Sequence, residues 1–323
     1  MKKVLIVRFS SIGDIVLTSP VVRALKSQLD DVEIHYLTKE SYKEIVNNNP
    51  NIEKVYTIKN KVAPVLTALK NEEYDFVIDL HHNLRTKRIK FALSAKNSSF
   101  PKLNIRKFLL TQFKINKMPK VHIVDRYFSA AKPLGVKNDH QGLDFFIPKE
   151  DEVNLASVNV PDQFIAFAIG AQFATKQLPV KSIIEVVGKI DQAVVLLGGE
   201  SDVNAAKEIS QACKNTIDFC GKLSLNQSAS IVKQAQKVIS HDTGLMHIAA
   251  AFNKPIISIW GNTVPDLGMY PYMPKNETDF SIHEVNHLKC RPCSKIGHQA
   301  CPKKHFGCML EQDLDAIAED VKS

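Results

Sequence analysis

The stretch that decides the fold is SHDTGLMHIAAA, residues 240–251. Residues 237–240, KVIS, lead into this stretch and predict a short apolar strand. The alanine-rich residues 245–252 predict a helix. Asp242 and Thr243 are residue types that begin helices, and Gly244 lets a ligand approach the backbone. A Lys-Pro turn and a second apolar strand follow, so the stretch predicts a βαβ unit.

The start of that helix has two interpretations. Its unpaired N–H groups and partial positive charge favour an anion, above all a phosphate. The alternative is an ordinary capped crossover helix in which His247 is a core histidine. The residues of this stretch leave both open.

The same alternation of strand and helix extends outward through the chain. In the first half, strands are predicted over 3–8, 32–38, 52–58 and 76–80, with helices over 15–29, 39–48 and 61–71. After a polar linker at 148–151, strands are predicted over 164–169, 193–197 and 216–219, with helices over 180–190 and 226–236. The pattern predicts an α/β fold of doubly wound parallel sheets, whose ligands lie outside the carboxyl ends of the strands.

Length and composition predict two domains. The chain has 323 residues, of which 44% are hydrophobic, enough for two ordinary cores. We expect domains over 1–150 and 151–310 and a C-terminal helix over 311–323. No Gly-x-Gly-x-x-Gly follows any predicted strand, which disfavours a dinucleotide-dependent dehydrogenase.

The charge of the chain is uneven. Residues 1–150 carry 26 Lys and Arg against 15 Asp and Glu, and residues 81–124 hold eleven basic residues and no acidic one. Such a stretch favours a polyanion, namely a phosphorylated glycolipid, an anionic membrane face or nucleic acid, although it could also be a solvated lysine-rich surface. No apolar run approaches the roughly 18 residues of a membrane span, so we expect a cytoplasmic protein.

Polar residues follow two strands of the first half. Gly13 and Asp14 come after the first strand, and His81, His82, Asn83 and Arg85 come after the fourth. Asp14 alone could be explained as the N-cap of the next helix.

Three motifs resemble glycosyltransferase family 9, the lipopolysaccharide heptosyltransferases. DTGLMHIAA at 242–250, followed by the Lys-Pro turn, is similar to the family motif that binds the diphosphate and sugar of a nucleotide-sugar. RFSSIGDIVLTSP at 8–20 resembles the N-terminal signature, and the GAxxATKxxP pattern at 170–179 resembles a motif whose lysine neutralises the donor phosphates. The resemblance covers nearly the whole chain and is weak between about 90 and 140.

The resemblance implies a fold and an activity. The fold is GT-B, two Rossmann-like domains facing a central cleft, with the acceptor bound by 1–150 and the donor by 151–310. The implied reaction is an inverting, metal-independent transfer of a sugar, heptose being the expected one, from an ADP-heptose-like donor to lipid A or the lipopolysaccharide core. The enzyme would be peripheral on the inner, anionic face of the cytoplasmic membrane and need no cofactor.

The resemblance also implies the site residues. Asp14 would be the catalytic base, and Lys176 would stabilise the leaving diphosphate. Glu200 would contact the ribose and Leu223 the base. The full donor set is Thr175, Lys176, Glu200, Leu223, Asp242, Thr243, Gly244 and His247. From their positions after the first and fourth strands, we expect Gly13, Asn83 and Arg85 to contact the acceptor.

Four cysteines gather near the C-terminus, at Cys290, Cys293, Cys301 and Cys308. The first pair has zinc-ligand spacing, whereas six residues separate the second pair, where a structural site usually has two to four. Bound zinc, plain thiols and a disulfide all stay open, and no metal belongs to the implied mechanism.

A second class of function fits part of the sequence. A non-catalytic, zinc-containing protein that binds nucleic acid or another polyanion would use the basic stretch and the cysteines. It leaves Asp14, Lys176 and the Asp242 motif unexplained, so we favour the enzyme and expect no nucleic-acid partner. The donor base, the sugar, the acceptor hydroxyl and the oligomeric state are not fixed by the sequence.

Overall fold

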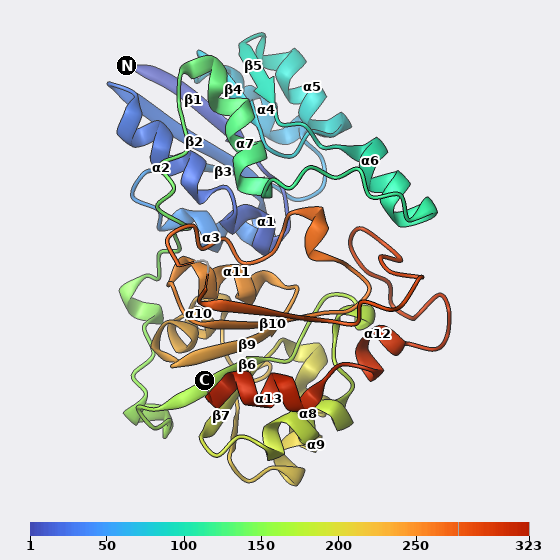
Figure 1. The fold of residues 1–323 in the computed structure, drawn as a ribbon. Coiled ribbons are helices and arrows are strands. Elements are labelled where there is room, and N and C mark those ends of the chain that lie inside the picture. The colour runs from blue at the N-terminus through green and yellow to red at the C-terminus, as the bar shows by residue number, and fades with distance from the viewer. Residues whose placement is uncertain (277, 323) are drawn as a thin grey trace. The chain divides into compact units, whose positions relative to one another are not determined.

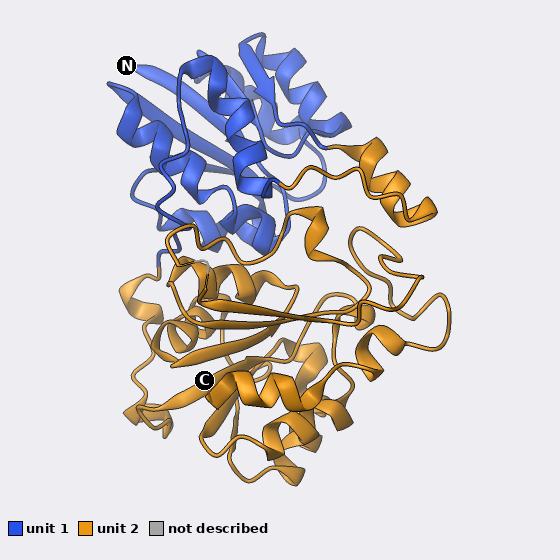
Figure 2. Ribbon diagram, in the orientation of Figure 1, with its two compact units in different colours: residues 1–102, 121–146 blue, residues 103–120, 147–323 orange. Residues whose placement is uncertain are grey.

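The computed structural model describes residues 1–276 and 278–322, and the chain folds into two compact α/β units. Unit 1 comprises residues 1–102 and 121–146, and unit 2 comprises residues 103–120 and 147–323 (Figure 2). The segment 103–120 therefore belongs structurally to unit 2, although it interrupts the sequence of unit 1. Each unit contains one parallel sheet.

Unit 1 has a five-stranded sheet in the order β3-β2-β1-β4-β5 (Figure 1). Its strands are β1 (Lys2–Val7), β2 (Val32–Lys39), β3 (Lys54–Ile58), β4 (Phe76–Asp79) and β5 (Lys96–Ser99). Its helices are α1 (Ile12–Val16), α2 (Ser19–Gln28), α3 (Lys43–Asn47), α4 (Ala63–Lys70), α5 (Leu84–Leu93) and α7 (Ile123–Ala131). Helix α2 packs beside α7 and α4 beside α5, so that helices cover both faces of the sheet.

Unit 2 has a six-stranded sheet in the order β11-β10-β9-β6-β7-β8. Its strands are β6 (Phe164–Ala168), β7 (Ala193–Leu197), β8 (Thr216–Asp218), β9 (Lys237–His241), β10 (Ile256–Trp260) and β11 (Phe280–Glu284). Its helices are α6 (Asn104–Phe108), which continues into a π-helical turn over Leu109–Phe113, then α8 (Val180–Gly188), α9 (Val203–Ala212), α10 (Leu225–Gln234), α11 (Gly244–Ala251), α12 (Gly307–Leu310) and α13 (Leu314–Lys322).

The central strands are buried on both faces, as expected for parallel sheets covered by helices. In unit 1, Leu5 and Val77 are fully buried in one core, and in unit 2 Phe167 and Ile239 are fully buried in another. Ile317 of α13 packs into the core of unit 2. Burying each such side chain contributes about 1.5 to 3 kcal/mol.

The sequence predicted this architecture and missed several of its elements. The helix expected over 15–29 is two helices, because Leu17 and Thr18 separate α1 from α2 and Pro20 lies in the first turn of α2. Strand β5, with the sequence KNSS, was missed because it has no apolar residue. The predicted fold class, α/β with doubly wound sheets, is confirmed.

The strand orders locate the ligand-binding edges. In both sheets the connections run in opposite directions from two adjacent strands, which are β1 and β4 in unit 1 and β6 and β9 in unit 2. Ligands of such sheets bind outside the carboxyl ends of those strands. The residues that follow those strands are 8–14 and 80–85 in unit 1 and 169–177 and 242–244 in unit 2.

Candidate active site

An ion pair between a buried arginine and a partly exposed aspartate marks the edge of the unit 1 sheet. The Nη2 atom of Arg8 lies 2.6 Å from Oδ1 of Asp14. The same guanidinium donates to the carbonyl of Ser10 at 2.7 Å and to the carbonyl of Leu80, beyond β4, at 2.6 Å. Arg8 therefore ties the end of β1 to the end of β4 and holds the carboxylate of Asp14, whose side chain stays 21% exposed.

Asp14 also lies in the first turn of α1. Its Oδ2 accepts from the hydroxyl of Ser11 at 2.9 Å and from the Ser11 backbone N–H at 3.3 Å. The interpretation of Asp14 as the N-cap is therefore wrong, because α1 begins three residues earlier than expected and Ser11 is its N-cap. Asp14 is the third residue of the helix, where one oxygen bonds back to Ser11 and the other meets Arg8.

A neutral histidine lies beside this pair. The ring of His81 lies 4.9 Å from that of Phe9. Burial, reinforced by the positive charges of Arg8 and Lys102, lowers the pKa of His81 to about 3. The imidazole is therefore uncharged at neutral pH.

The two predicted acceptor residues after β4 have different surroundings. Asn83 caps α5, because its Oδ1 accepts from the N–H of Thr86 at 3.0 Å. Arg85 lies over the ring of Phe9, with 5.0 Å from the guanidinium carbon to the ring centre, and reaches the carbonyl of Asn60 at 3.4 Å. Asn60 also lines a cavity of about 390 Å³ together with Lys39, Glu40, Ser41, Ile58 and Lys59.

The sequence reasoning missed a buried carboxylate that shapes this loop. Asp79, fully buried, accepts from the backbone N–H groups of His81 at 3.1 Å and His82 at 2.6 Å, and it pairs with Lys90 at 3.1 Å. A charged residue at the end of the apolar strand FVID was the available signal. Its bonds set the path of the chain toward Asn83 and Arg85.

In unit 2 the structure brings two of the predicted motifs together. The Nζ atom of Lys176, from the loop after β6, lies 2.6 Å from Oδ2 of Asp242 and 3.0 Å from its carbonyl oxygen. The same Oδ2 accepts from the hydroxyl of Thr263 at 2.8 Å. Thr243 is the N-cap of α11, and Gly244 is its first residue. A cation, a helix N-terminus and a carboxylate thus meet at this edge of the sheet.

Thr175 has a structural role that the sequence prediction did not include. Thr175 is buried, with 2% of its surface exposed. Its hydroxyl accepts from the backbone N–H of His298 at 2.8 Å and donates to Oδ1 of Asn262 at 3.1 Å. These bonds fix the lysine-bearing loop to the cysteine-rich segment. The predicted contact of Thr175 with the donor stays a prediction.

Two histidines of the motif at 240–251 are buried. His241 accepts from the N–H of Leu178 through Nε2 at 3.0 Å, and burial lowers its pKa to about 4. His247 is 2% exposed, which agrees with the core-histidine interpretation. Its predicted contact with the donor is untested.

The predicted nucleoside contacts lie at the ends of β7 and β8. Glu200 is exposed, and a Cβ placed on Gly221 would lie 3.3 Å from its carboxylate oxygen. Leu223, half-buried, follows two residues later. The sequence reasoning missed Asp202, which accepts from the N–H of Gly199 at 2.8 Å and lies so close to Gly170 that any Cβ there would be 2.2 Å from its Oδ2.

The six cysteines are all free thiols. Burial raises the pKa of Cys308 to about 12 and, with the neighbouring Cys290, that of Cys293 to about 11. Over residues 1–276 and 278–322, the one group of three potential metal ligands with all atoms within 4.8 Å of one another is Glu33, His35 and Glu72, not the cysteines. Zinc at the cysteines therefore stays an open alternative.

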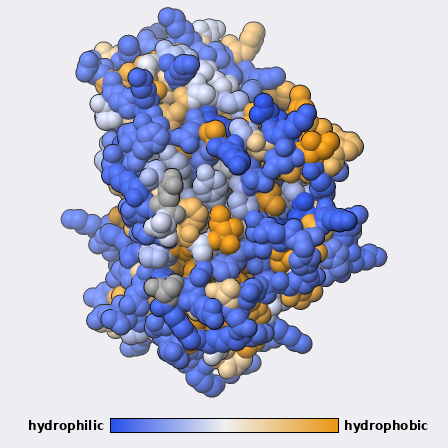
Figure 3. Space-filling model, viewed as in Figure 1, coloured by the Kyte–Doolittle hydropathy of each residue, from blue (hydrophilic) through white to orange (hydrophobic). Residues whose placement is uncertain are grey.

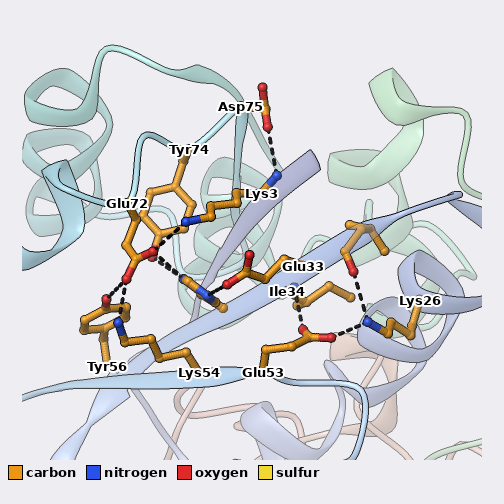
Figure 4. Close-up of polar contacts among 12 residues, drawn as sticks. Lys3, Lys26, Glu33, Ile34, Glu53, Lys54, Tyr56, Glu72, Tyr74 and Asp75 are labelled. Carbon is orange, nitrogen blue, oxygen red and sulfur yellow. Dashed lines mark hydrogen bonds and ion pairs between the residues drawn. The ribbon is translucent and has the colours of Figure 1, made fainter. Parts of the chain in front are cut away.

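The side chains of Glu33, His35 and Glu72 are already hydrogen-bonded or ion-paired within the protein (Figure 4). Glu72 accepts from Lys54 at 2.6 Å and from Lys3 at 2.9 Å, and these bonds, with one from Tyr56, lower its pKa to about 2. His35 contacts Tyr74 through one ring nitrogen and Glu33 through the other, each at 2.8 Å. Two lysines beside Glu72 would repel a cation, so the network is structural.

Comparison with known proteins identifies the class. The fold matches the glycosyl transferase family 9 structure from Veillonella parvula, with a TM-score of 0.78, 21% identity and coverage of 99% of this chain and 96% of that one. It also matches Escherichia coli heptosyltransferase WaaC with ADP, with a TM-score of 0.70, 20% identity and coverage of 99% of both chains. Two parallel-sheet units and these neighbours define a GT-B fold, as predicted.

The family follows from the sequence match. Residues 62–301 match the model of glycosyltransferase family 9 (heptosyltransferase), and the chain belongs to this family. The chain is therefore a glycosyltransferase, which confirms the resemblance. Curated relatives include lipooligosaccharide heptosyltransferase 2 of Haemophilus influenzae, 26% identical over 92% of this chain and 94% of the relative, and lipopolysaccharide heptosyltransferase 3 of E. coli K12, 26% identical over 78% and 80%.

Proposed function

We propose that the enzyme transfers heptose from an ADP-heptose-like donor to lipid A or the lipopolysaccharide core, with inversion and without a metal. The observation that carries the proposal is the Lys176–Asp242 pair at the start of α11, 2.6 Å between Nζ and Oδ2. Relatives of nearly the same length are heptosyltransferases, and similar E. coli structures hold ADP and ADP-2-deoxy-2-fluoro heptose.

In this proposal, unit 2 binds the donor. The phosphates displace Asp242 from Lys176 and accept from the N–H groups at the start of α11, which stabilises the charge that develops on the leaving diphosphate. Thr243, Gly244 and His247 complete this side of the site. Glu200 contacts the ribose and Leu223 the base.

The N-terminal domain, residues 1–150, supplies the base and the acceptor contacts. Asp14 takes the proton of the acceptor hydroxyl while its oxygen bonds to the anomeric carbon and the bond from that carbon to the diphosphate breaks. Attack opposite to the leaving group inverts the configuration. Arg8 keeps the carboxylate oriented, and Gly13, Asn83 and Arg85 contact the acceptor and its phosphates.

Metal independence is a separate part of the proposal. Lys176 and the helix N-terminus supply positive charge that a divalent cation would otherwise provide. The dodecameric glycosyltransferase TibC, which shares the fold at a TM-score of 0.58 and 13% identity, is iron-containing. Activity in excess chelator, combined with metal analysis of the protein, tests this part, and an absolute need for an added cation would contradict it.

The decisive experiment measures thermal stabilisation by nucleoside diphosphates and their sugars, followed by NMR of the glycosylated product. Ligands that bind only the native state raise its stability, and at a fixed concentration a tighter ligand raises it more. We expect stabilisation by ADP and ADP-heptose and an inverted anomeric configuration. No stabilisation by any nucleotide, with tight zinc and salt-sensitive RNA binding, would favour the polyanion-binding alternative.

We also propose that the enzyme acts in the cytoplasm, peripherally on the inner face of the membrane. A lipid-linked acceptor requires access to a bilayer surface, and the basic residues of 81–124 suit an anionic one. Within the described parts of the chain, no helix has the length and apolarity needed for a membrane span.

A further inference from the structure

The segment 103–120 turns large apolar side chains toward solvent. Ile105 is 78% exposed, Phe108 56%, Phe113 61% and Ile115 47%. The rings of Phe108 and Phe113 meet edge to face with centres 5.8 Å apart. Hydrophobic residues are seen at the surface over this segment in Figure 3. A soluble protein rarely exposes such a group of large side chains without a partner.

The same segment is strongly cationic. It carries Arg106, Lys107, Lys114, Lys117 and Lys120, and no acidic residue occurs from position 81 to 124. Aromatic and aliphatic side chains interspersed with cations along one segment suit the boundary between phosphate headgroups and acyl chains, where both kinds of side chain are stabilised. Nucleic acid would satisfy the charge but not the exposed isoleucines.

The segment is anchored to the rest of unit 2. The Nζ atom of Lys114 donates to the carbonyl of Pro292 at 2.7 Å, and Asn116 donates to Asp266 at 2.7 Å. Leu110, between Phe108 and Phe113 in the sequence, is only 5% exposed. The exposed side chains therefore belong to a segment that is held against the rest of unit 2.

We infer that residues 105–117 dock on the surface of an anionic phospholipid bilayer. Ile105, Phe108, Phe113 and Ile115 enter the headgroup region, and Arg106, Lys107 and Lys117 meet lipid phosphates. The inference rests on the proposed function in one respect, since a lipid-embedded acceptor gives the docking its purpose. The docking itself can be measured without any sugar transfer.

The test is co-sedimentation of the full-length protein with vesicles of phosphatidylcholine alone or mixed with phosphatidylglycerol. We expect binding to the anionic vesicles that weakens with salt. The double variant Phe108→Ser, Phe113→Ser should lower vesicle binding by about tenfold or more, because two large apolar side chains no longer leave water. A second variant carries Arg106→Gln, Lys107→Gln, Lys117→Gln and Lys120→Gln. It should lose the salt-dependent part of vesicle binding, and it keeps Lys114 because that residue anchors the segment.

Matched controls make the same kinds of substitution at exposed positions outside residues 103–120. Ile296→Ser with Leu310→Ser alters two residues that are 54% and 57% exposed, and a second control replaces the exposed lysines Lys181, Lys207, Lys214 and Lys322 by Gln. Both should bind vesicles like the parent. All variants should retain stabilisation by ADP, which separates failure of docking from failure of the proposed function.

Three results would overturn the inference. One is vesicle binding by both segment variants that equals the parent's. Another is a loss of RNA binding in those variants while vesicle binding persists, which would assign the segment to nucleic acid. The third is a concentration-dependent dimer, seen by sedimentation equilibrium, that the double Phe variant abolishes without changing vesicle binding.

Discussion

The two units place the same pair of groups, a cation and an aspartate, at the same edge of their sheets but hold them differently. In unit 1, Arg8 is 7% exposed and bonds to Asp14 and to the carbonyls of Ser10 and Leu80. In unit 2, the ammonium of Lys176 bonds to Asp242, through its side chain and its carbonyl, among the described residues. A neutral histidine lies near each pair, His81 in one and His241 in the other.

The difference separates a fixed pair from an exchangeable one. The Arg8 guanidinium bonds through all three of its nitrogen atoms, so moving it would leave the carbonyls of Ser10 and Leu80 without their donor. The Lys176 ammonium is on a flexible side chain and can form a new bond to a bound anion. We therefore expect the unit 1 pair to preserve geometry and the unit 2 pair to open for phosphate. Four experiments test this contrast.

Breaking the fixed pair should have the largest effect. Arg8→Met leaves Asp14 without its cation and the carbonyls of Ser10 and Leu80 without their donor, so the free energy of unfolding should fall by about 3 to 5 kcal/mol. Urea denaturation measures this loss. Lys176→Met is the matched control, and an equal loss there would show that the two pairs are held alike.

Removing the proposed base should reduce turnover strongly. Asp14→Asn keeps the size and an oxygen that can accept from Ser11, but it cannot take a proton, so kcat should fall by about a hundredfold or more. Donor affinity, followed by thermal stabilisation with ADP, should be unchanged. Near-normal turnover would leave Asp14 as a partner of Ser11 and Arg8.

Opening the exchangeable pair should weaken phosphate binding. Lys176→Ala removes one charge-assisted contact, which costs about 1.5 to 3 kcal/mol for a nucleoside diphosphate and much less for the nucleoside. Calorimetry with both ligands gives the comparison. Equal losses for ADP and adenosine would exclude Lys176 from the phosphate site.

The smallest effect is a pH dependence shared by the two histidines. Their pKa values, about 3 for His81 and about 4 for His241, lie below the ordinary value of 6.5, so the unfolded chain binds protons more readily. Their contribution to stability is complete above pH 6.5 and is lost as the pH falls toward 4. Between pH 6.5 and 5.5, protonation of each histidine in the unfolded chain should lower the free energy of unfolding by up to about 1 kcal/mol.

His241→Gln sharpens this comparison, because its side-chain oxygen can still accept from the N–H of Leu178 but does not titrate. Stability curves from urea denaturation at several pH values should be shallower for this variant than for the parent, with the contribution of His81 remaining. An unchanged slope would mean that His241 is not the buried neutral group described above.

The sequence by itself determined the fold class and which residues follow the ends of the buried strands. Runs of apolar residues predict the buried strands. Polar residues just after those strands lie at the carboxyl edge of their own sheet, Asp14 in unit 1 and Lys176 with Asp242 in unit 2, because the carboxyl ends of parallel strands lie together. The motif resemblance added the family, which the match over residues 62–301 confirms. The roles of the individual site residues remain predictions.

The tertiary structure alone decided which groups pair and which segments join. Thr175 bonds to His298, 123 residues away, and Arg8 bonds to the carbonyl of Leu80, 72 residues away. The polar strand β5 forms because β4 offers it an edge, not because its own residues favour a strand. Residues 103–120 belong to unit 2 through contacts such as Lys114 to Pro292. Local patterns carry no record of such long-range contacts, which depend on how elements distant in the chain pack together.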